Sequence, residues 1–176
     1  MPLDLVPVLD RLDLVAAPVA AALHGWPRAG EVLVAPIDPE LADTASFCAA
    51  YDVGLDASAN CVVVAAKRGG DVRYAACMVL ATARADVNGV VRRHLDARKA
   101  SFAPMDDAVA LTGMAYGGIT PIGLPADWPV LVDEAVVAAG PVVIGSGIRG
   151  SKLLLPGEAL TDLPGAVALG LSSPSG

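Results

Sequence analysis

Two glycine-rich segments are the parts of this sequence whose residue types and spacing could do chemistry. The first, residues 113–123, reads Gly-Met-Ala-Tyr-Gly-Gly-Ile-Thr-Pro-Ile-Gly and holds four glycines and one proline. Glycines let a ligand approach the backbone closely, and proline stiffens a loop in one shape. A tight crossover between a helix and a sheet would use the same residues. Composition alone therefore leaves a ligand-binding loop and a structural crossover both open.

The second segment, residues 145–150, reads Gly-Ser-Gly-Ile-Arg-Gly and matches the G-x-G-x-x-G pattern of dinucleotide-binding folds. That fold requires the loop to open a helix, with an acidic residue about 20 positions later. Here residues 152–155 predict a strand, and residues 165–170 contain no carboxylate. The segment therefore predicts no nucleotide cofactor, but its backbone N–H groups could hold a carbonyl or phosphate.

Cysteine and histidine offer little further chemistry. Three widely spaced cysteines lie among apolar residues, which is typical of buried thiols rather than of a disulfide framework or a zinc site. Neither of the two histidines has metal-ligand spacing or a neighbouring serine or cysteine. We therefore expect no metal, no cofactor and no histidine-based catalytic triad. These residues are Cys48, Cys61, Cys77, His24 and His94.

The elements that position these loops follow from hydrophobic periodicity and turn residues. The best strand signal, residues 61–66, precedes a Gly-Gly turn at 67–71 and a partner strand at 73–82, which predicts an antiparallel hairpin. Asp43-Thr44 is a helix N-cap signal, and so is Asp86. Together the elements predict a single α/β domain with a mixed sheet. Further strands are expected at 31–37, 100–103, 130–133, 141–144 and 152–155, and helices at 2–22, 45–51, 86–95, 104–112 and 158–163.

Length and composition restrict the class of protein. A chain of 176 residues suits one domain with a core of its own. It is 55% hydrophobic, but its apolar stretches are interrupted before the ~18 residues that a membrane span needs. The N-terminus lacks the basic and apolar regions of a signal peptide. These features predict a soluble cytoplasmic protein with no membrane partner.

The net charge of −7 argues against a protein that coats DNA or RNA. All of it lies in residues 1–58, which hold nine acidic and two basic side chains. Residues 84–99 instead hold five basic and two acidic side chains, with His94 in addition. This basic stripe is either a solvated helix face or a contact for one stretch of RNA backbone.

The motifs together resemble a known family. The pattern K-A-S-F-A-P-M…L-T-G…G-G-I-T-P-I-G within residues 99–123 resembles the YbaK/EbsC family of aminoacyl-tRNA editing domains. That family includes free-standing ProX proteins, deacylases of the Cys-tRNA(Pro) type and the editing insertion of bacterial prolyl-tRNA synthetases. The apolar run 130–133, the Gly-Ile-Arg-Gly turn at 147–150 and Asp43-Thr44 extend the resemblance over about residues 40–165.

The resemblance implies a mixed α/β fold, with a partly rolled mixed β-sheet and surrounding helices. It implies a domain at 40–170. We expect an N-terminal helical or extended segment at 1–39 packed on this domain, and the polar C-terminal residues predict a flexible tail at 171–176. The implied activity is hydrolysis of the ester that joins a wrong amino acid to the 3′ end of a tRNA. Such a reaction needs positioning and oxyanion stabilisation rather than a cofactor. The implied partners are the 3′ end of an aminoacyl-tRNA and an aminoacyl-tRNA synthetase.

The candidate site residues of this chain form three groups, of which the first two rest on the resemblance and the third on the basic stripe. The catalytic group is Asn60, Gly117 and Gly118. The substrate-binding group is Thr44, Thr120, Pro121, Asp133, Ser146, Gly147, Arg149 and Lys152. The group expected on the tRNA backbone is Arg92, Arg93, Arg98 and Lys99.

The chain departs from the family pattern where relatives usually carry a lysine, at the start of the first core strand. Asn60 stands there and brings hydrogen bonds without a fixed charge. Lys67 falls at the hairpin turn and is no substitute, whereas Lys152, where some relatives have Asp, could return a cation to the groove. Gly145 stands where many relatives have Ser. We expect an editing deacylase with altered or reduced activity. The alternatives are a non-catalytic module that binds an aminoacyl-like ligand or a synthetase, and a small-molecule ester or thioester hydrolase, which no nucleophile supports.

Overall fold

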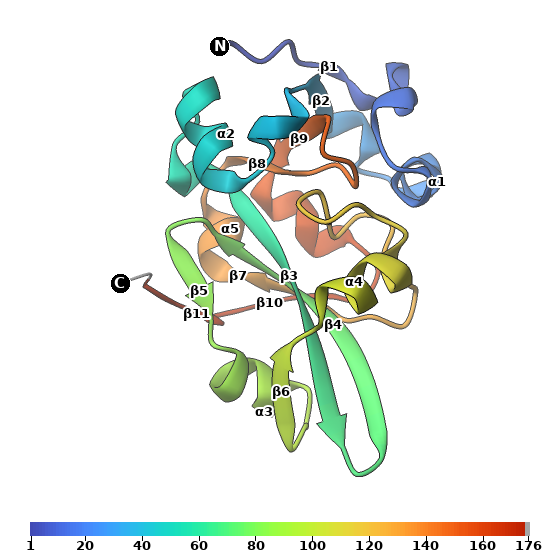
Figure 1. The fold of residues 1–176 in the computed structure, drawn as a ribbon, viewed down its shortest axis with the longest axis vertical. Coiled ribbons are helices and arrows are strands. Elements are labelled where there is room, and N and C mark those ends of the chain that lie inside the picture. Colours follow the sequence, from blue (N-terminus) through green and yellow to red (C-terminus); the bar gives the residue numbers. More distant parts are fainter. Residues whose placement is uncertain (175–176) are drawn as a thin grey trace.

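A long antiparallel hairpin forms the axis of the protein in the computed structural model, which describes residues 1–174 (Figure 1). Strand β3 (Ala59–Arg68) pairs along its whole length with β4 (Asp71–Leu80). Gly69 makes the turn at a φ of +61°, a conformation that glycine adopts without strain. The predicted hairpin is therefore confirmed; β3 is longer than expected, and β4 has the expected length but begins two residues earlier.

Three more strands complete a five-stranded mixed sheet around this hairpin. The strand order is β10 (Ala166–Leu169), β7 (Val130–Asp133), β4, β3 and β6 (Lys99–Phe102). Strand β7 runs parallel to both β4 and β10, whereas β3 pairs antiparallel with β4 and β6. All four residues of β7 are buried, as expected for a central parallel strand. The expected mixed α/β fold is confirmed.

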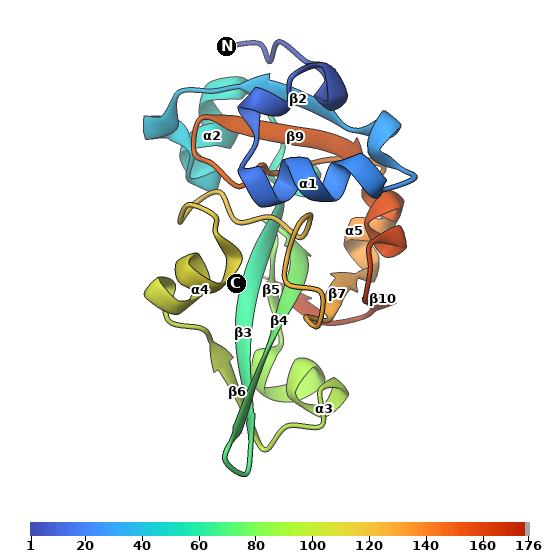
Figure 2. The ribbon, with the colours of Figure 1, turned by 90° about the vertical axis from the view of Figure 1, so that its right-hand side faces the viewer.

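A second, antiparallel sheet crosses one end of the hairpin (Figure 2). Its order is β1 (Val6–Pro7), β2 (Leu33–Pro36), β9 (Ser151–Pro156) and β8 (Pro141–Gly145). A bridge between Ser58 and Val143 joins this sheet to the residue just before β3. The largest hydrophobic core cluster includes Met78 of β4 and Leu153 of β9, so both sheets share it.

Short helical segments cover the sheets and shape the connections. Asp43 caps α2 by accepting a 3.0 Å hydrogen bond from the Ser46 backbone N–H, and Asp86 accepts from the amides of Gly89 and Val90, as the cap signals predicted. The α-helices are α1 (Ala17–Gly25), α2 (Thr44–Tyr51), α3 (Arg92–His94), α4 (Met105–Thr112) and α5 (Glu134–Ala138). A π-helical turn spans Val87–Val91, and 3-10 turns span Val8–Asp10, Leu12–Leu14, Ala29–Glu31, Pro39–Leu41, Leu55–Ala57 and Gly157–Asp162.

The predicted helix over residues 2–22 is wrong for most of its length. Residues Val6–Pro7 form a strand, and the α-helix begins only at Ala17. The prolines explain the difference: Pro7 would remove a helical hydrogen bond, whereas Pro18 occupies the first turn of α1, where no such bond is lost. The predicted helix 86–95 likewise opens as a π-helical turn containing Gly89.

The C-terminal segment differs from the expected flexible tail. Leu171 is fully buried, and β11 (Ser172–Pro174) pairs antiparallel with β5 (Ala83–Ala85). The buried Asp133 carboxylate holds this segment, because it accepts hydrogen bonds from the Leu171 amide at 3.1 Å and from the Ser172 hydroxyl. Residues 175–176 of the expected tail lie outside the described residues.

The helices of this fold are short, and α1, with nine residues, is the longest of those described. Among residues 1–174, none of the helices has both the length and the apolar character required to cross a membrane.

The position of Asp133 predicts a structural role for this side chain. Replacing Asp133 with Ala removes the acceptor of two hydrogen bonds in a buried site, so we expect the free energy of unfolding to fall by about 1–3 kcal/mol. Urea denaturation measures this change, and D127A, at an exposed aspartate, is the matched control. A stability for D133A equal to that of D127A would contradict the structural role.

Candidate functional site

A polar cavity of about 310 Å³ opens where the start of β3 meets α2, strands β8 and β9 and the glycine-rich loop 113–123. Five of the residues expected at the site line it, and they come from four separate segments of the chain. The cavity therefore exists only because the fold brings these segments together. The five residues are Thr44, Asn60, Gly117, Arg149 and Lys152.

Asn60 and Thr44 are paired at one wall of the cavity. The Thr44 hydroxyl, in the first turn of α2, donates a 2.7 Å hydrogen bond to the Asn60 side-chain oxygen. Since this bond engages the amide oxygen, the NH₂ group is the donor that Asn60 can offer to a ligand. Asn60 therefore contributes a neutral donor to this wall of the cavity.

Lys152 brings a positive charge to the same cavity from β9. Its ammonium group donates to the Ala42 backbone oxygen at 3.1 Å and lies 5.2 Å from the centre of the Phe47 ring. Burial lowers the pKa of Lys152 below its usual value, while the carbonyl and the ring favour the charged form. Lys152, which was expected to return a cation to the groove, thus lines the cavity from β9, whereas Asn60 lines it from β3.

Arg149 clamps the glycine-rich loop beside the cavity. Its guanidinium donates to the backbone oxygens of Tyr116, at 3.3 Å, and Pro39, at 3.1 Å. The Asp43 carboxylate has a lowered pKa, chiefly because the Ser46 backbone N–H donates to it, with a smaller contribution from the charge of Arg149. Arg149 therefore positions the loop and adds a second positive charge to the cavity wall.

The two glycine-rich segments pack backbone against backbone. The Gly147 N–H donates to the Gly118 carbonyl at 2.7 Å, and the Gly118 N–H donates to the Ala115 carbonyl at 2.9 Å. A Cβ atom on Gly118 would lie 2.6 Å from the Ile148 carbonyl oxygen. These amides, expected to hold a substrate carbonyl, are instead occupied within the protein. Gly118 and Gly147 therefore shape the cavity without donating into it.

Four other residues expected at the site lie outside the cavity lining. Ser146 is fully buried, and its hydroxyl takes part in hydrogen bonds with Ser151. Thr120 is also fully buried, and within residues 1–174 its hydroxyl has no hydrogen-bond partner. Pro121 lines a separate, largely apolar cavity, and Asp133 anchors the C-terminal segment. These four residues were expected to contact the substrate, but they do not line the cavity.

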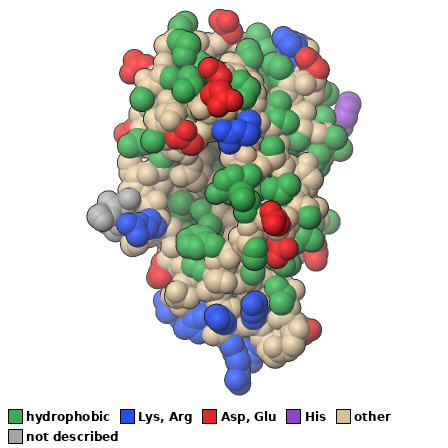
Figure 3. All heavy atoms as spheres, viewed as in Figure 1, with side chains coloured by type: hydrophobic (Ala, Val, Ile, Leu, Met, Phe, Trp, Pro, Cys, Tyr) green, Lys and Arg blue, Asp and Glu red, His purple; other side chains and the backbone are tan. Residues whose placement is uncertain are grey.

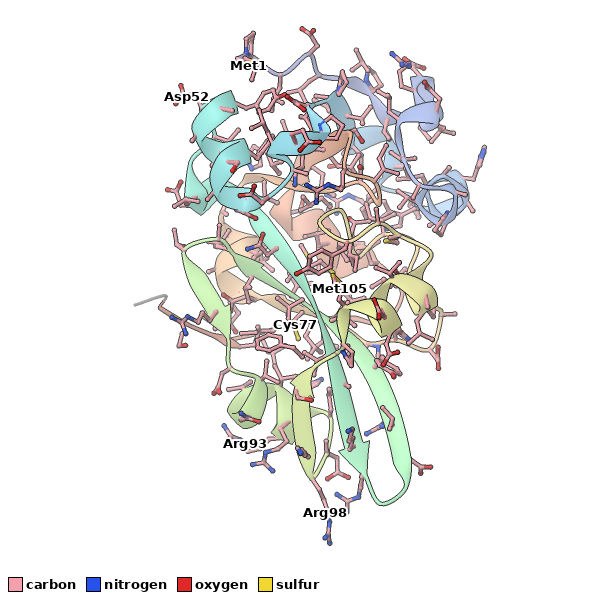
Figure 4. The ribbon with its side chains drawn as sticks, viewed as in Figure 1. Met1, Asp52, Cys77, Arg93, Arg98 and Met105 are labelled. Carbon is pink, nitrogen blue, oxygen red and sulfur yellow. The ribbon has the colours of Figure 1, made fainter. Side chains whose placement is uncertain are left out.

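The basic residues expected on the tRNA backbone lie far from the cavity, at the opposite end of β3 (Figures 3 and 4). Lys99 is in register with Lys67, seven residues along β3 from Asn60. At ~3.3 Å per residue, that separation is about 23 Å. Arg93, Arg98 and Lys99 are exposed, whereas Arg92 is half-buried. They form a separate surface rather than part of the cavity.

Tyr116 and Cys61 are among the lining residues that the sequence did not assign to the site. The available signal for Tyr116 was its place directly before two glycines. A glycine loop provides no apolar side chains for the ring to pack against. Burial raises the pKa of the Cys61 thiol far above its usual value. The thiol is therefore neutral and unsuited to nucleophilic attack.

The close packing of Gly118 predicts that a side chain at this position destabilises the protein. We expect G118A to lower the free energy of unfolding by more than 1 kcal/mol, roughly the cost of overpacking, because its Cβ would meet backbone atoms. G70A is the matched control, since a Cβ there meets nothing within 4 Å. Chemical denaturation compares the two variants, and equal stabilities would contradict the tight contact.

Solved structures show the same fold. A proposed trans-editing enzyme for prolyl-tRNA synthetase superposes with a TM-score of 0.75 at 20% identity, covering 89% of this chain and 95% of that one. A scaffold protein from a study of computational epitope grafting gives 0.76 at 21% identity, with 90% and 97% covered. A signal transduction candidate from Marinobacter aquaeolei gives 0.56 at 17% identity, and the match covers 88% of this chain but only 30% of that protein.

Sequence comparison identifies the family directly. The model of the aminoacyl-tRNA editing domain matches residues 38–163, well over half of the chain. This stretch contains α2, the hairpin, both glycine-rich segments and every residue of the cavity lining. The chain belongs to the aminoacyl-tRNA editing domain family.

Proposed function

We propose that this protein is a trans-acting editing deacylase, which hydrolyses the ester between an incorrect amino acid and the 3′ end of a tRNA. The observation that carries this proposal is the convergence of Lys152, Asn60 and Arg149 on one polar cavity in a chain of the editing family. Two cations and a neutral donor suit an ester substrate whose alcohol part carries phosphate. The cavity volume of about 310 Å³ is at the lower end of the range for small-molecule sites.

The reaction needs only water and stabilisation of charge. Water adds to the ester carbonyl carbon, the bond to the ribose oxygen breaks, and that oxygen takes a proton. The products are a free amino acid and a tRNA with its 3′-terminal hydroxyl restored. Negative charge develops on the carbonyl oxygen during attack, and the Lys152 ammonium with the Asn60 amide N–H would stabilise it. Arg149 acts on the loop through the Tyr116 carbonyl and is a positioning residue.

The replacement of the family lysine by Asn60 predicts altered or reduced activity in this proposal. Lys152 enters the cavity from β9 and is already engaged by the Ala42 carbonyl. Approach to a substrate oxygen would compete with that contact. The cation is therefore present, but its position differs from that of a lysine at the start of β3.

The second candidate is a non-catalytic binding module. It is favoured because hydrogen-bond donors around the cavity already donate to other groups of the protein. The amides of Gly118 and Gly147 are hydrogen-bonded internally, and Thr44 engages the Asn60 side chain. A cavity with these donors removed could hold an aminoacyl group, or a synthetase segment, without hydrolysing an ester.

Deacylation of mischarged tRNAs separates the two candidates. We expect the wild-type protein to release amino acid from at least one member of a full panel, and K152M to lower the rate about 10²- to 10³-fold, as loss of an oxyanion donor does. K152R keeps the charge and is the matched control, with thermal unfolding of each variant showing that the fold is intact.

The substitution N60K distinguishes the two candidates if the wild-type protein releases no amino acid. If the wild type releases nothing across the panel and N60K creates activity, the native protein is a binding module. Release that is equally fast in K152M and K152R would contradict the role of the Lys152 charge.

The proposal also includes a contact between the basic stripe and the tRNA backbone. We expect the combined replacement of Arg92, Arg93 and Arg98 by Gln to weaken tRNA binding. The slope of log K against log salt should fall by roughly 0.7–0.9 for each phosphate that the protein no longer neutralises. R11Q, at an exposed arginine outside the stripe, is the matched control in the same titration. An unchanged salt slope would make the stripe a solvated helix face.

A further inference from the structure

A second groove, of about 350 Å³, adjoins the cavity along β3 and β6. We infer that this groove binds the unpaired nucleotides at the 3′ end of an RNA, by stacking their bases on Tyr116 and Phe102. The biological role of this groove rests on the proposed function. The binding event itself requires no hydrolysis. The groove lining includes Cys61, Phe102, Met105, Tyr116 and Ile119.

The distribution of aromatic side chains singles out this groove. The chain has only seven aromatic residues, and the structure describes all of them. Phe102 and Tyr116 are the two exposed ones, at 64% and 60% of their surface, and both line the groove. Met105, at 51% exposure, lies beside them. The other five are buried or half-buried: Trp26, Phe47, Tyr51, Tyr74 and Trp128. Exposed aromatic rings in a groove are the surface on which unpaired bases stack.

The groove is continuous with the proposed active site. Cys61, Tyr116 and Ile119 line both the groove and the polar cavity. A ligand whose end occupies the cavity therefore passes over Tyr116 as it leaves. In an aminoacylated RNA, the groups that follow the ester are the terminal nucleotides, so bases would meet the aromatic side chains next.

The groove leads on to the basic end of the molecule. Strand β6 runs from Lys99 at that end to Phe102 in the groove, three residues or about 10 Å apart. Figure 4 shows Met105 between the upper part of the molecule and the side chains of Arg93 and Arg98. The cavity, the aromatic groove and the basic end thus lie in the same order as three parts of an aminoacylated RNA: the ester, the unpaired bases and the more distant phosphates.

The charge of the protein favours an RNA over an apolar protein segment as the occupant. Residues 67–73 and 92–99 hold seven of the twelve basic side chains and only two acidic ones. The rest of the chain carries five basic and seventeen acidic side chains. Such a separation repels a polyanion from most of the surface and directs it to the hairpin end (Figure 3), which β6 connects to Phe102 in the groove.

Binding of an unacylated RNA hairpin with a four-nucleotide 3′ overhang tests the inference. A 2-aminopurine in the overhang reports stacking by its fluorescence, and a blunt hairpin of the same sequence reports backbone binding alone. We expect F102A and Y116L each to weaken overhang binding between about fivefold and 150-fold, as the loss of one base–aromatic stack implies, and to abolish the fluorescence change. Y116F should retain both, and neither F102A nor Y116L should affect the blunt hairpin.

The controls separate this inference from the proposed function. L9A, at an exposed leucine outside the groove, should bind like the wild type. Overhang binding that F102A and Y116L leave unchanged, or a loss that is equal for overhang and blunt hairpins, would overturn the inference. Loss of synthetase binding with unchanged RNA affinity would also overturn it, because the groove would then be a protein interface. Absence of deacylation, with the stacking result intact, would refute the deacylase and leave the RNA groove standing.

Discussion

The contact between the Gly118 and Gly147 backbones is the constraint on which the rest of the site depends. The loop after α4 and the turn between β8 and β9 approach so closely that a Cβ at Gly118 or at Gly145 would lie 2.6 Å from a backbone oxygen of the other segment. The loop thereby reaches the second sheet, and Arg149 fixes it there through the carbonyl of Tyr116. The walls of the cavity, and the exposed ring of Tyr116, follow from this contact.

The site chemistry follows from which strands supply its side chains. Strand β3 offers the neutral Asn60, held by Thr44, and β9 offers the Lys152 ammonium, partly buried beside Phe47. A cation near an ester carbonyl stabilises developing negative charge without a covalent intermediate, which agrees with the neutral state of the Cys61 thiol. The opposite end of the hairpin carries the charge that a polyanionic substrate would meet first.

Local signals predicted the hairpin, the caps at Asp43 and Asp86, and the strands around the glycine-rich segments, because each depends on neighbouring residues. The N-terminal helix was overpredicted, since apolar spacing alone ignored Pro7 and the pairing of β1 with β2. Asp133 illustrates the limit for the site: the family resemblance placed this carboxylate among the substrate-binding residues, and only the tertiary fold reveals that Leu171 and Ser172 donate hydrogen bonds to it. Lys152 was expected to return a cation to the groove, and it lines the cavity. Its contacts with the Ala42 carbonyl and the Phe47 ring, however, join residues more than 100 positions apart in the sequence.

The position of a bound, non-hydrolysable substrate analogue would show whether Lys152 and Asn60 hold the reacting carbonyl. A crystal structure with adenosine carrying an amide-linked aminoacyl group at its 3′ position would show where the reacting group lies. We expect the aminoacyl carbonyl between Lys152 and Asn60, with the adenine toward Tyr116. An analogue bound instead in the apolar cavity beside Trp26 and Trp128, with the Lys152 cavity empty, would contradict it.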